Sequence, residues 1–105
     1  MESSTQKATI VVVGRFREGY EKFFADYSQK VRAFLDARGA IVVRRQRVER
    51  VLYGDATPDL VMVIDFPEKE TAETVFLEPE YLALIPLREK VFADFQMFLA
   101  NYGEV

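Results

Sequence analysis

The segment Leu60–Phe66, with the sequence LVMVIDF, constrains the fold of this chain more than any other. Side chains of a β-strand point alternately to the two faces of its sheet. Apart from Asp65, every residue of the segment is apolar, so both faces of the strand require cover. Pro67 then ends the strand, because proline has no backbone N–H to donate to a neighbouring strand. The segment therefore predicts a strand inside a sheet that is buried on both sides.

The residues before this strand predict a strand, a long helix and a second strand. Residues 8–13 form the β-branched run ATIVVV, which is typical of a strand. Residues 18–38 repeat apolar side chains at intervals of three and four, which predicts a helix with one apolar stripe. Gly39 is placed to end that helix in the left-handed conformation. Residues 40–53 predict a long strand with a bulge near Gln46.

The residues after Pro67 predict two short helical segments and a last strand. Residues 68–77 carry an apolar side at helical spacing, and Pro79 suits the first turn of a second segment. Pro86 is expected to interrupt that second segment. Residues 94–101 alternate in the manner of a strand. The full order is strand, helix, strand, strand, helical pair, strand.

This order predicts an α+β domain with the ferredoxin-like βαββαβ fold over residues 8–105, after a flexible tail at residues 1–7. In that fold a four-stranded antiparallel sheet carries its helices on one face. The other face would be bare, although the strands are apolar on both sides. A bare apolar sheet exceeds the few hundred Å² of apolar patch that a soluble monomer exposes. We therefore expect a homodimer in which two copies pack sheet to sheet.

Three residue types are missing from the chain: cysteine, histidine and tryptophan. The missing cysteines and histidines exclude a disulfide framework, a Ser-His-Asp triad, a thiolate zinc site and a His-ligated haem. We expect no metal and no cofactor. The 14 basic and 17 acidic residues give a net charge of −3, which offers no electrostatic reason to bind nucleic acid or an anionic membrane. Residues 1–7 lack the apolar core of a signal peptide, so we expect a cytoplasmic protein.

From about Gly39 onwards, the sequence resembles the family called domain of unknown function 1330. The matching stretches are IVVR at residues 41–44, LYGD at 52–55, PDLVMVIDFP at 58–67, TAETVF at 71–76 and PEYLALIPLR at 79–88. The resemblance implies the fold of the dimeric α+β barrels. Relatives with that fold include cofactor-independent monooxygenases, isomerases and proteins that only bind ligands.

Four polar residues form the first candidate site: Arg44, Tyr53, Tyr81 and Arg88. In a ferredoxin-like dimer the pocket lies between the sheet and its own helices. There Arg44 and Arg88 would hold a small anionic or aromatic ligand through charge-assisted hydrogen bonds. Tyr81 or Tyr53 would donate a proton or polarise a carbonyl. The alternative is structural, with Arg88 paired to an acid such as Asp65 and both tyrosines as core aromatics that keep a polar tip.

Asp65 is the second candidate, because it is a carboxylate in an otherwise apolar strand. Burial there would raise its pKa towards the range of a useful general base. In the alternative it is solvated, or it caps the helix that starts near Glu68. Glu80 is a further acid that would pair with Arg88 in the structural interpretation.

Two side-chain patterns have simpler interpretations. The basic run at residues 44–50 favours ion pairs across the dimer over nucleic-acid binding, because an acidic residue is interleaved and the whole chain is acidic. The aromatic stripe of the long helix lines a ligand pocket or simply forms core. Its members are Phe23, Phe24, Tyr27 and Phe34.

Three functions remain open at this point. The chain is an enzyme that acts on a small aromatic or carbonyl compound, a non-catalytic ligand-binding or regulatory dimer, or a structural dimer whose cleft is filled by its own side chains. A cavity of roughly 300 Å³ or more between sheet and helices would separate the first two from the third.

Overall fold

The computed structural model describes residues 6–103 and has the predicted ferredoxin-like fold. Four strands form one sheet in the order β2-β3-β1-β4, and every neighbouring pair is antiparallel. The elements in chain order are β1 (Ala8–Phe16), α1 (Glu21–Asp36), β2 (Ile41–Arg47), β3 (Leu60–Phe66), α2 (Lys69–Thr74), a 3₁₀ turn η1 (Val75–Leu77), α3 (Pro79–Leu82), α4 (Ile85–Val91) and β4 (Phe92–Asn101).

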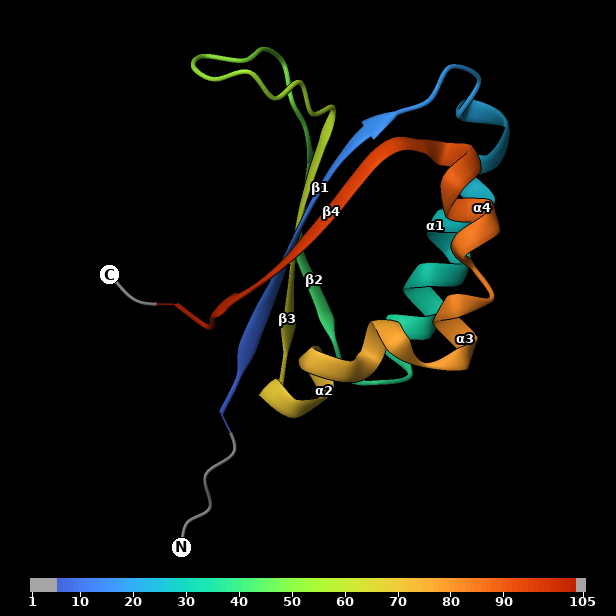
Figure 1. Ribbon diagram of the computed structural model, residues 1–105. Helices are drawn as coiled ribbons and strands as arrows, with labels where there is room; N and C mark the ends of the chain where they lie inside the picture. The colour runs from blue at the N-terminus through green and yellow to red at the C-terminus, as the bar shows by residue number, and fades with distance from the viewer. Residues whose placement is uncertain (1–5, 104–105) are drawn as a thin grey trace, which may run out of the picture.

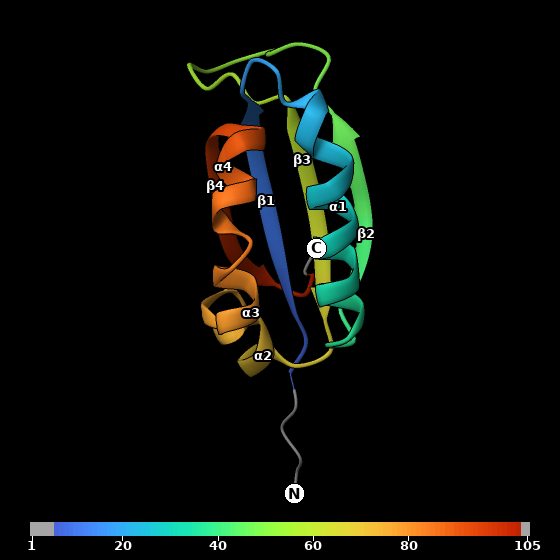
Figure 2. The ribbon, with the colours of Figure 1, turned by 90° about the vertical axis from the view of Figure 1, so that its right-hand side faces the viewer.

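All the helices lie on one face of the sheet (Figure 1). Seen from that side, α1 runs along one half of the sheet, and α3 and α4 run along the other half (Figure 2). We call this the helix-covered face. No element from the described part of the chain covers the opposite face, which we call the helix-free face. Residues paired across antiparallel strands share a face, so the pairs Val11–Val63 and Val13–Val61 lie on the helix-free face.

The core fills the space between the helix-covered face and the helices. β1 and β3 contribute alternate residues to it, because every second side chain of a strand points to the same side. α1 buries the apolar stripe that its spacing predicted, although the helix is shorter at both ends than residues 18–38. The most completely buried side chains are Val12, Leu35, Ile64, Phe66, Val75, Tyr81 and Val91.

Gly14 directly follows the strand predicted over residues 8–13, and Gly39 was expected to end the long helix. Gly14 lies inside β1, so the prediction that the strand ends at residue 13 was wrong. A Cβ at Gly14 would lie 2.7 Å from the ring of Phe92, and glycine is therefore needed there for close packing. Gly39 has the predicted left-handed conformation, with φ +74°. The Ala40 N–H donates to the Leu35 carbonyl at 3.1 Å, which closes the end of α1.

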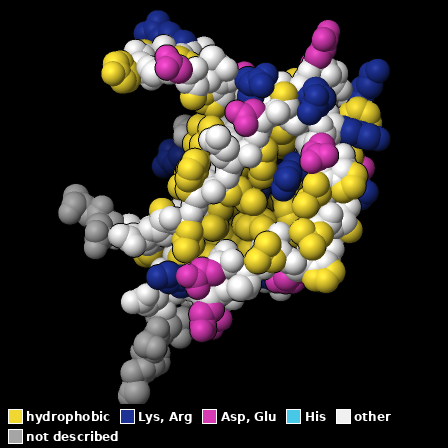
Figure 3. Space-filling model, viewed as in Figure 1, with side chains coloured by type: hydrophobic (Ala, Val, Ile, Leu, Met, Phe, Trp, Pro, Cys, Tyr) yellow, Lys and Arg dark blue, Asp and Glu magenta, His cyan; other side chains and the backbone are white. Residues whose placement is uncertain are grey.

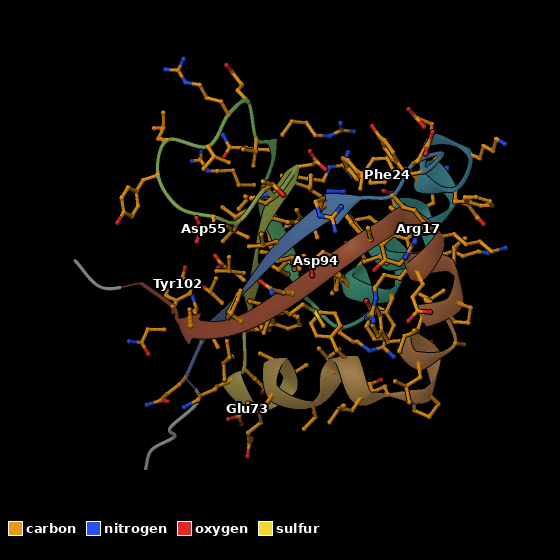
Figure 4. All side chains as sticks on the ribbon, turned by 45° about the horizontal axis from the view of Figure 1, so that its top comes forward. Arg17, Phe24, Asp55, Glu73, Asp94 and Tyr102 are labelled. Carbon is orange, nitrogen blue, oxygen red and sulfur yellow. The ribbon has the colours of Figure 1, made fainter. Side chains whose placement is uncertain are left out.

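β2 ends at Arg47, so the prediction of one strand over residues 40–53 was wrong in its second half. Arg47 pairs with Leu60, the first residue of β3, and the chain beyond it has no strand to pair with. Residues 48–59 instead form a projecting loop, which we call the arm. The arm leaves the sheet on its helix-free side (Figure 1). Figure 4 shows Asp55 on the arm, on the opposite side of the sheet from Phe24.

The bulge predicted in β2 is present, but at a different residue. The register shifts at Val43 and not near Gln46. A bulge moves every following side chain of its strand to the opposite face. Arg45 therefore lies opposite Met62, on the helix-covered face.

The helical region after Pro67 is divided as predicted. α3 and α4 are separate helices, and Pro86 stands in the first turn of α4, where its missing N–H costs no hydrogen bond. α4 passes directly into β4, which begins at Phe92 and so two residues before the predicted start.

The predicted tail at residues 1–7 falls mostly outside the described residues. Within it, the Gln6 carbonyl accepts a hydrogen bond from the Lys69 N–H at 2.7 Å. Between residues 6 and 103, no helix has the length and apolar character needed to cross a bilayer.

Candidate functional site

A cavity of about 310 Å³ lies between the helix-covered face and the helices. Its volume is at the lower end of the range typical of small-molecule sites. The wall is mainly apolar, with Val12 and Ile64 from the centre of the sheet and Phe92, Phe95 and Met97 from β4. Figure 3 shows a hollow with an apolar floor between β4 and the helices. The cleft is therefore open and is not filled by the protein's own side chains.

Two tyrosine hydroxyls meet in this wall. The Oη atoms of Tyr27, from α1, and Tyr81, from α3, are 3.0 Å apart. Arg88, from α4, donates from Nη1 to the Tyr81 Oη at 3.2 Å. Both tyrosines are buried, with Tyr81 only 1% exposed, and both line the cavity. Three helices thus join one hydrogen-bonded chain, which we call the Tyr27–Tyr81–Arg88 chain.

The Tyr27–Tyr81–Arg88 chain leaves one hydroxyl hydrogen free to donate to a ligand. Each tyrosine has one O–H to donate, and the bond between them uses one of the two. Arg88 is donor only, so it occupies an acceptor position on Tyr81 and takes no hydrogen. Among the described residues, no other hydrogen bond from either hydroxyl is present. A buried donor without an acceptor is costly, so the arrangement suits a ligand oxygen in the cavity.

Burial keeps the Tyr27 hydroxyl protonated. Desolvation raises the pKa of Tyr27 far above its ordinary value, and the neighbouring Tyr81 raises the pKa further. The Arg88 charge opposes this change in the pKa of Tyr27 but is the smallest of the causes. A tyrosine in this state donates a hydrogen bond and does not act as a base.

Arg88 lies behind Tyr81, and it is not among the residues that line the cavity. Its guanidinium carbon is 4.7 Å from the centre of the Phe95 ring. Among residues 6–103, no carboxylate lies within 4.0 Å of it, so the structural alternative in which Arg88 pairs with an acid is wrong. Glu80 instead pairs with Arg38 at 3.0 Å.

Asp65 and Tyr53, two other predicted site residues, lie elsewhere. Asp65 accepts a hydrogen bond from the Thr9 hydroxyl at 2.8 Å, and this pair belongs to the helix-free face. Tyr53 stands on the arm with 97% of its side chain exposed. Neither residue lines the cavity. The structure therefore brings together Tyr81 and Arg88 from the predicted set and separates Asp65 and Tyr53 from them.

Arg44 and Arg45 both border the cavity, but only Arg45 contacts its helical wall. Arg44 lies opposite Val63, and the side chains of that pair belong to the helix-free face. Arg45 donates from Nη1 to the Ser28 Oγ at 3.4 Å, and its guanidinium carbon is 5.4 Å from the Phe24 ring centre.

Sequence reasoning therefore missed the hydrogen-bonding role of Tyr27, and it missed Arg45. Tyr27 was assigned to the aromatic stripe that lines a ligand pocket or forms core, and Phe24 and Tyr27 of that stripe do line the cavity. The signal for the role of Tyr27 was the hydroxyl itself, since a tyrosine in a buried stripe needs a hydrogen-bond partner there. Arg45 had no signal of this kind, because the bulge decides which face it is on. A bulge of one residue cannot be located from alternation when both faces of a strand carry apolar and polar residues.

The described residues contain no group of three or more acidic side chains close enough to hold a metal ion. With histidine and cysteine missing from the whole chain, we identify no metal ligand set at the cavity.

The sequence matches the family described as domain of unknown function (DUF1330) over residues 6–101. The chain belongs to this family. The match includes the first strand and α1, which the resemblance from Gly39 onwards did not cover. Among curated proteins, none matches this DUF1330 protein in sequence.

Solved structures with the same fold include RPA0582, a protein of unknown function from Rhodopseudomonas palustris. It is 16% identical with a TM-score of 0.81, and the alignment covers 97% of this chain and 86% of that one. SnoaB, a cofactor-independent oxygenase from Streptomyces nogalater, is 12% identical with a TM-score of 0.67, covering 95% and 96%. A dimeric protein of unknown function with a ferredoxin-like fold, from Bacteroides fragilis, is 10% identical with a TM-score of 0.61, covering 93% and 99%. At these identities the likeness concerns the fold alone.

Proposed function

We propose that this DUF1330 protein binds a small aromatic or carbonyl compound in the cavity and stabilises negative charge on the oxygen of that compound. The supporting observation is the Tyr27–Tyr81–Arg88 chain, which presents one free O–H to a mainly apolar cavity. A preformed donor in a site that excludes water stabilises an oxyanion more strongly than water does. Arg88 strengthens the donor, because a cation that donates to Tyr81 makes the Tyr81 hydroxyl a better donor.

An enzymatic role is the second candidate. Stabilising an enolate or phenolate is a step in the activation of such compounds, and the oxygenase from Streptomyces nogalater shares the fold. Within this proposal the free O–H of the Tyr27–Tyr81 pair polarises the substrate oxygen, with Arg88 behind Tyr81. Asp65 and Tyr53 are left out because neither lines the cavity.

The test is the pKa of a bound phenol. 2-Naphthol absorbs at different wavelengths as phenol and as phenolate, so its pKa can be followed by titration with and without the protein. We expect the bound pKa to be lower than the free value, and the decrease to be smaller in Tyr81→Phe. Tyr53→Phe is the matched control, because that residue is on the arm and should leave the bound pKa as in the wild type. A bound pKa equal to or above the free value would contradict the proposal.

We also propose that the protein is a homodimer through the helix-free face. The face carries apolar side chains exposed to solvent, among them Ile41 at 64% and Phe98 at 51%. The arm adds Leu52 and Tyr53, at 84% and 97%, on the same side of the sheet (Figure 1). A monomer would leave this surface in water at a cost, whereas a second copy covers it. The protein from Bacteroides fragilis that shares the fold is described as dimeric.

A further inference from the structure

The cavity has a second polar end, at the edge of the sheet that β2 forms. Ser28 and Arg32 of α1 and Arg45 of β2 all line it there. The Tyr27–Tyr81–Arg88 chain runs from α1 towards the other edge, where the Arg88 guanidinium carbon is 4.7 Å from the centre of the Phe95 ring of β4. β2 and β4 are the two edge strands of the sheet, so the two polar ends face each other across an apolar middle.

Arg45 has most of its hydrogen-bonding capacity unused. A guanidinium has five N–H donors, and among residues 6–103 Arg45 makes one hydrogen bond, to the Ser28 Oγ at 3.4 Å. Arg47 differs, because its guanidinium is packed on an aromatic cluster, 4.6 Å from the Phe16 ring centre and 5.9 Å from that of Tyr20. Arg45 is therefore the arginine of β2 with donors to offer at the cavity.

The wall of the cavity is positive, although the chain as a whole is acidic. From the helix-covered side, the side chains of Arg32 and Arg45 line it, and no aspartate or glutamate among the described residues does. The nearest opposing charge to Arg32 is Asp36, at 4.0 Å on an exposed surface, where an ion pair contributes little. Two cations without a carboxylate at one end of a partly enclosed cavity attract an anion.

We infer that the ligand is an elongated carboxylate, with its carboxylate at Arg45 and a phenol or carbonyl oxygen at the Tyr27–Tyr81 pair. The inference rests on the proposed function, which supplies the oxygen contact. β2 and β4 are three strand spacings apart, about 14 Å, which is an upper limit for the separation between Arg45 and the tyrosine pair. A two-ring aromatic body substituted at both ends fits within that limit. Arg45 presents parallel N–H groups, which suit a bidentate bond to a carboxylate.

Two probes that differ in one group test this inference. 2-Naphthol has the ring and the hydroxyl, and 6-hydroxy-2-naphthoic acid adds a carboxylate at the far end. We expect the acid to bind the wild-type protein about ten- to hundredfold more tightly than 2-naphthol, by isothermal titration calorimetry. Arg45→Gln should remove this advantage and leave the affinity for 2-naphthol unchanged. Arg44→Gln is the matched control, because the neighbouring arginine belongs to the helix-free face and its loss should preserve most of the advantage.

The outcomes separate the two proposals. If 2-naphthol binds and the acid binds no more tightly, the inference is wrong and the proposed function stands. If Arg44→Gln removes as much of the advantage as Arg45→Gln does, the assignment to Arg45 is wrong. If neither probe binds, the proposed function is wrong and the inference with it. The comparison of probes on the wild-type protein needs no variant, so it holds even where a substitution impairs folding.

Discussion

The two faces of the sheet are built from similar residues but have different surroundings. In β3, Ile64 points to the helix-covered face and is 1% exposed, whereas its neighbour Val63 points to the helix-free face and is half-buried. On one side helices enclose a cavity with polar groups at two ends. On the other side an apolar surface and the arm remain open to solvent in the single chain. The same apolar composition therefore serves a core and a binding cavity on one face and an association surface on the other.

The largest expected effect compares Ile64→Ala with Val63→Ala, two neighbours that point to opposite faces. Ile64→Ala should lower the free energy of unfolding by about 3 kcal/mol at any protein concentration, because it leaves a void in the core. The cost of Val63→Ala should depend on protein concentration, since the side chain contributes mainly to association. Urea unfolding at two concentrations, a hundredfold apart, measures both. An identical concentration dependence for the two variants would contradict the distinction between the faces.

The next effect concerns the helix-free face as a dimer surface. Phe98→Lys should raise the dimer dissociation constant more than tenfold, because it places a charge in an apolar interface. Leu82→Lys is the matched control, since Leu82 is 45% exposed on the helical layer and Phe98 is 51% exposed on the sheet. Sedimentation velocity over a range of concentrations gives both constants. A wild-type protein that sediments as a monomer at micromolar concentration would overturn the dimer.

A smaller effect is expected from the hydroxyl pair in the cavity wall. Tyr27→Phe should cost about 1 kcal/mol of folding stability, and Tyr81→Phe somewhat more, because Arg88 then loses its acceptor. The double variant should cost little more than Tyr81→Phe alone, since both single changes remove the same bond. Thermal or urea unfolding measures the cycle. If the stability costs of the two single variants add up in the double variant, the two hydroxyls are independent and the prediction is wrong. Tyr53→Phe is the control and should leave the folding stability unchanged.

The smallest effect is a dependence on pH from the link between α1 and α3. Arg38 donates to Glu78 at 2.7 Å, and this bond holds the pKa of the Glu78 carboxyl below its ordinary value. A lowered pKa in the folded state means that folding favours the ionised form. The contribution is therefore complete above the ordinary pKa of the carboxyl and is lost as the pH falls through the lowered one. Glu78→Gln should weaken the loss of stability in acid, as followed by unfolding from pH 7 to pH 3.

Much of the fold was predictable from local patterns. The strand Leu60–Phe66, the end of α1 at Gly39 and the separation of α3 from α4 at Pro86 all follow from backbone chemistry within a few residues. The errors fell where pairing between distant residues decides the outcome. β2 ends at Arg47 because its pairing partner β3 begins at Leu60. No feature within residues 48–53 indicates that the strand has already ended.

The candidate site was predictable only in part, for the same reason. Tyr81 and Arg88 are seven residues apart along one helical region, so their contact could be anticipated from sequence. Tyr27 is 54 residues away from Tyr81, and its role depends on how α1 packs against α3. The choice between Arg44 and Arg45 depends on one extra residue in a strand, which reverses the face of every residue after it.

The sequence by itself determined the order of the elements, the left-handed Gly39 after α1 and an apolar character on both faces of the sheet, because these depend on local backbone preference and on side-chain periodicity. It also excluded every site that requires histidine or cysteine. The tertiary structure alone decided which polar side chains meet. Leu60–Phe66 illustrates both parts of this result. The sequence predicted that this segment is a strand with two apolar faces. The pairing of this strand with β2, which has a bulge at Val43, decided which arginine faces the cavity. Side-chain convergence depends on the register between strands and on the packing of helices, and both are set by contacts between residues far apart in the chain.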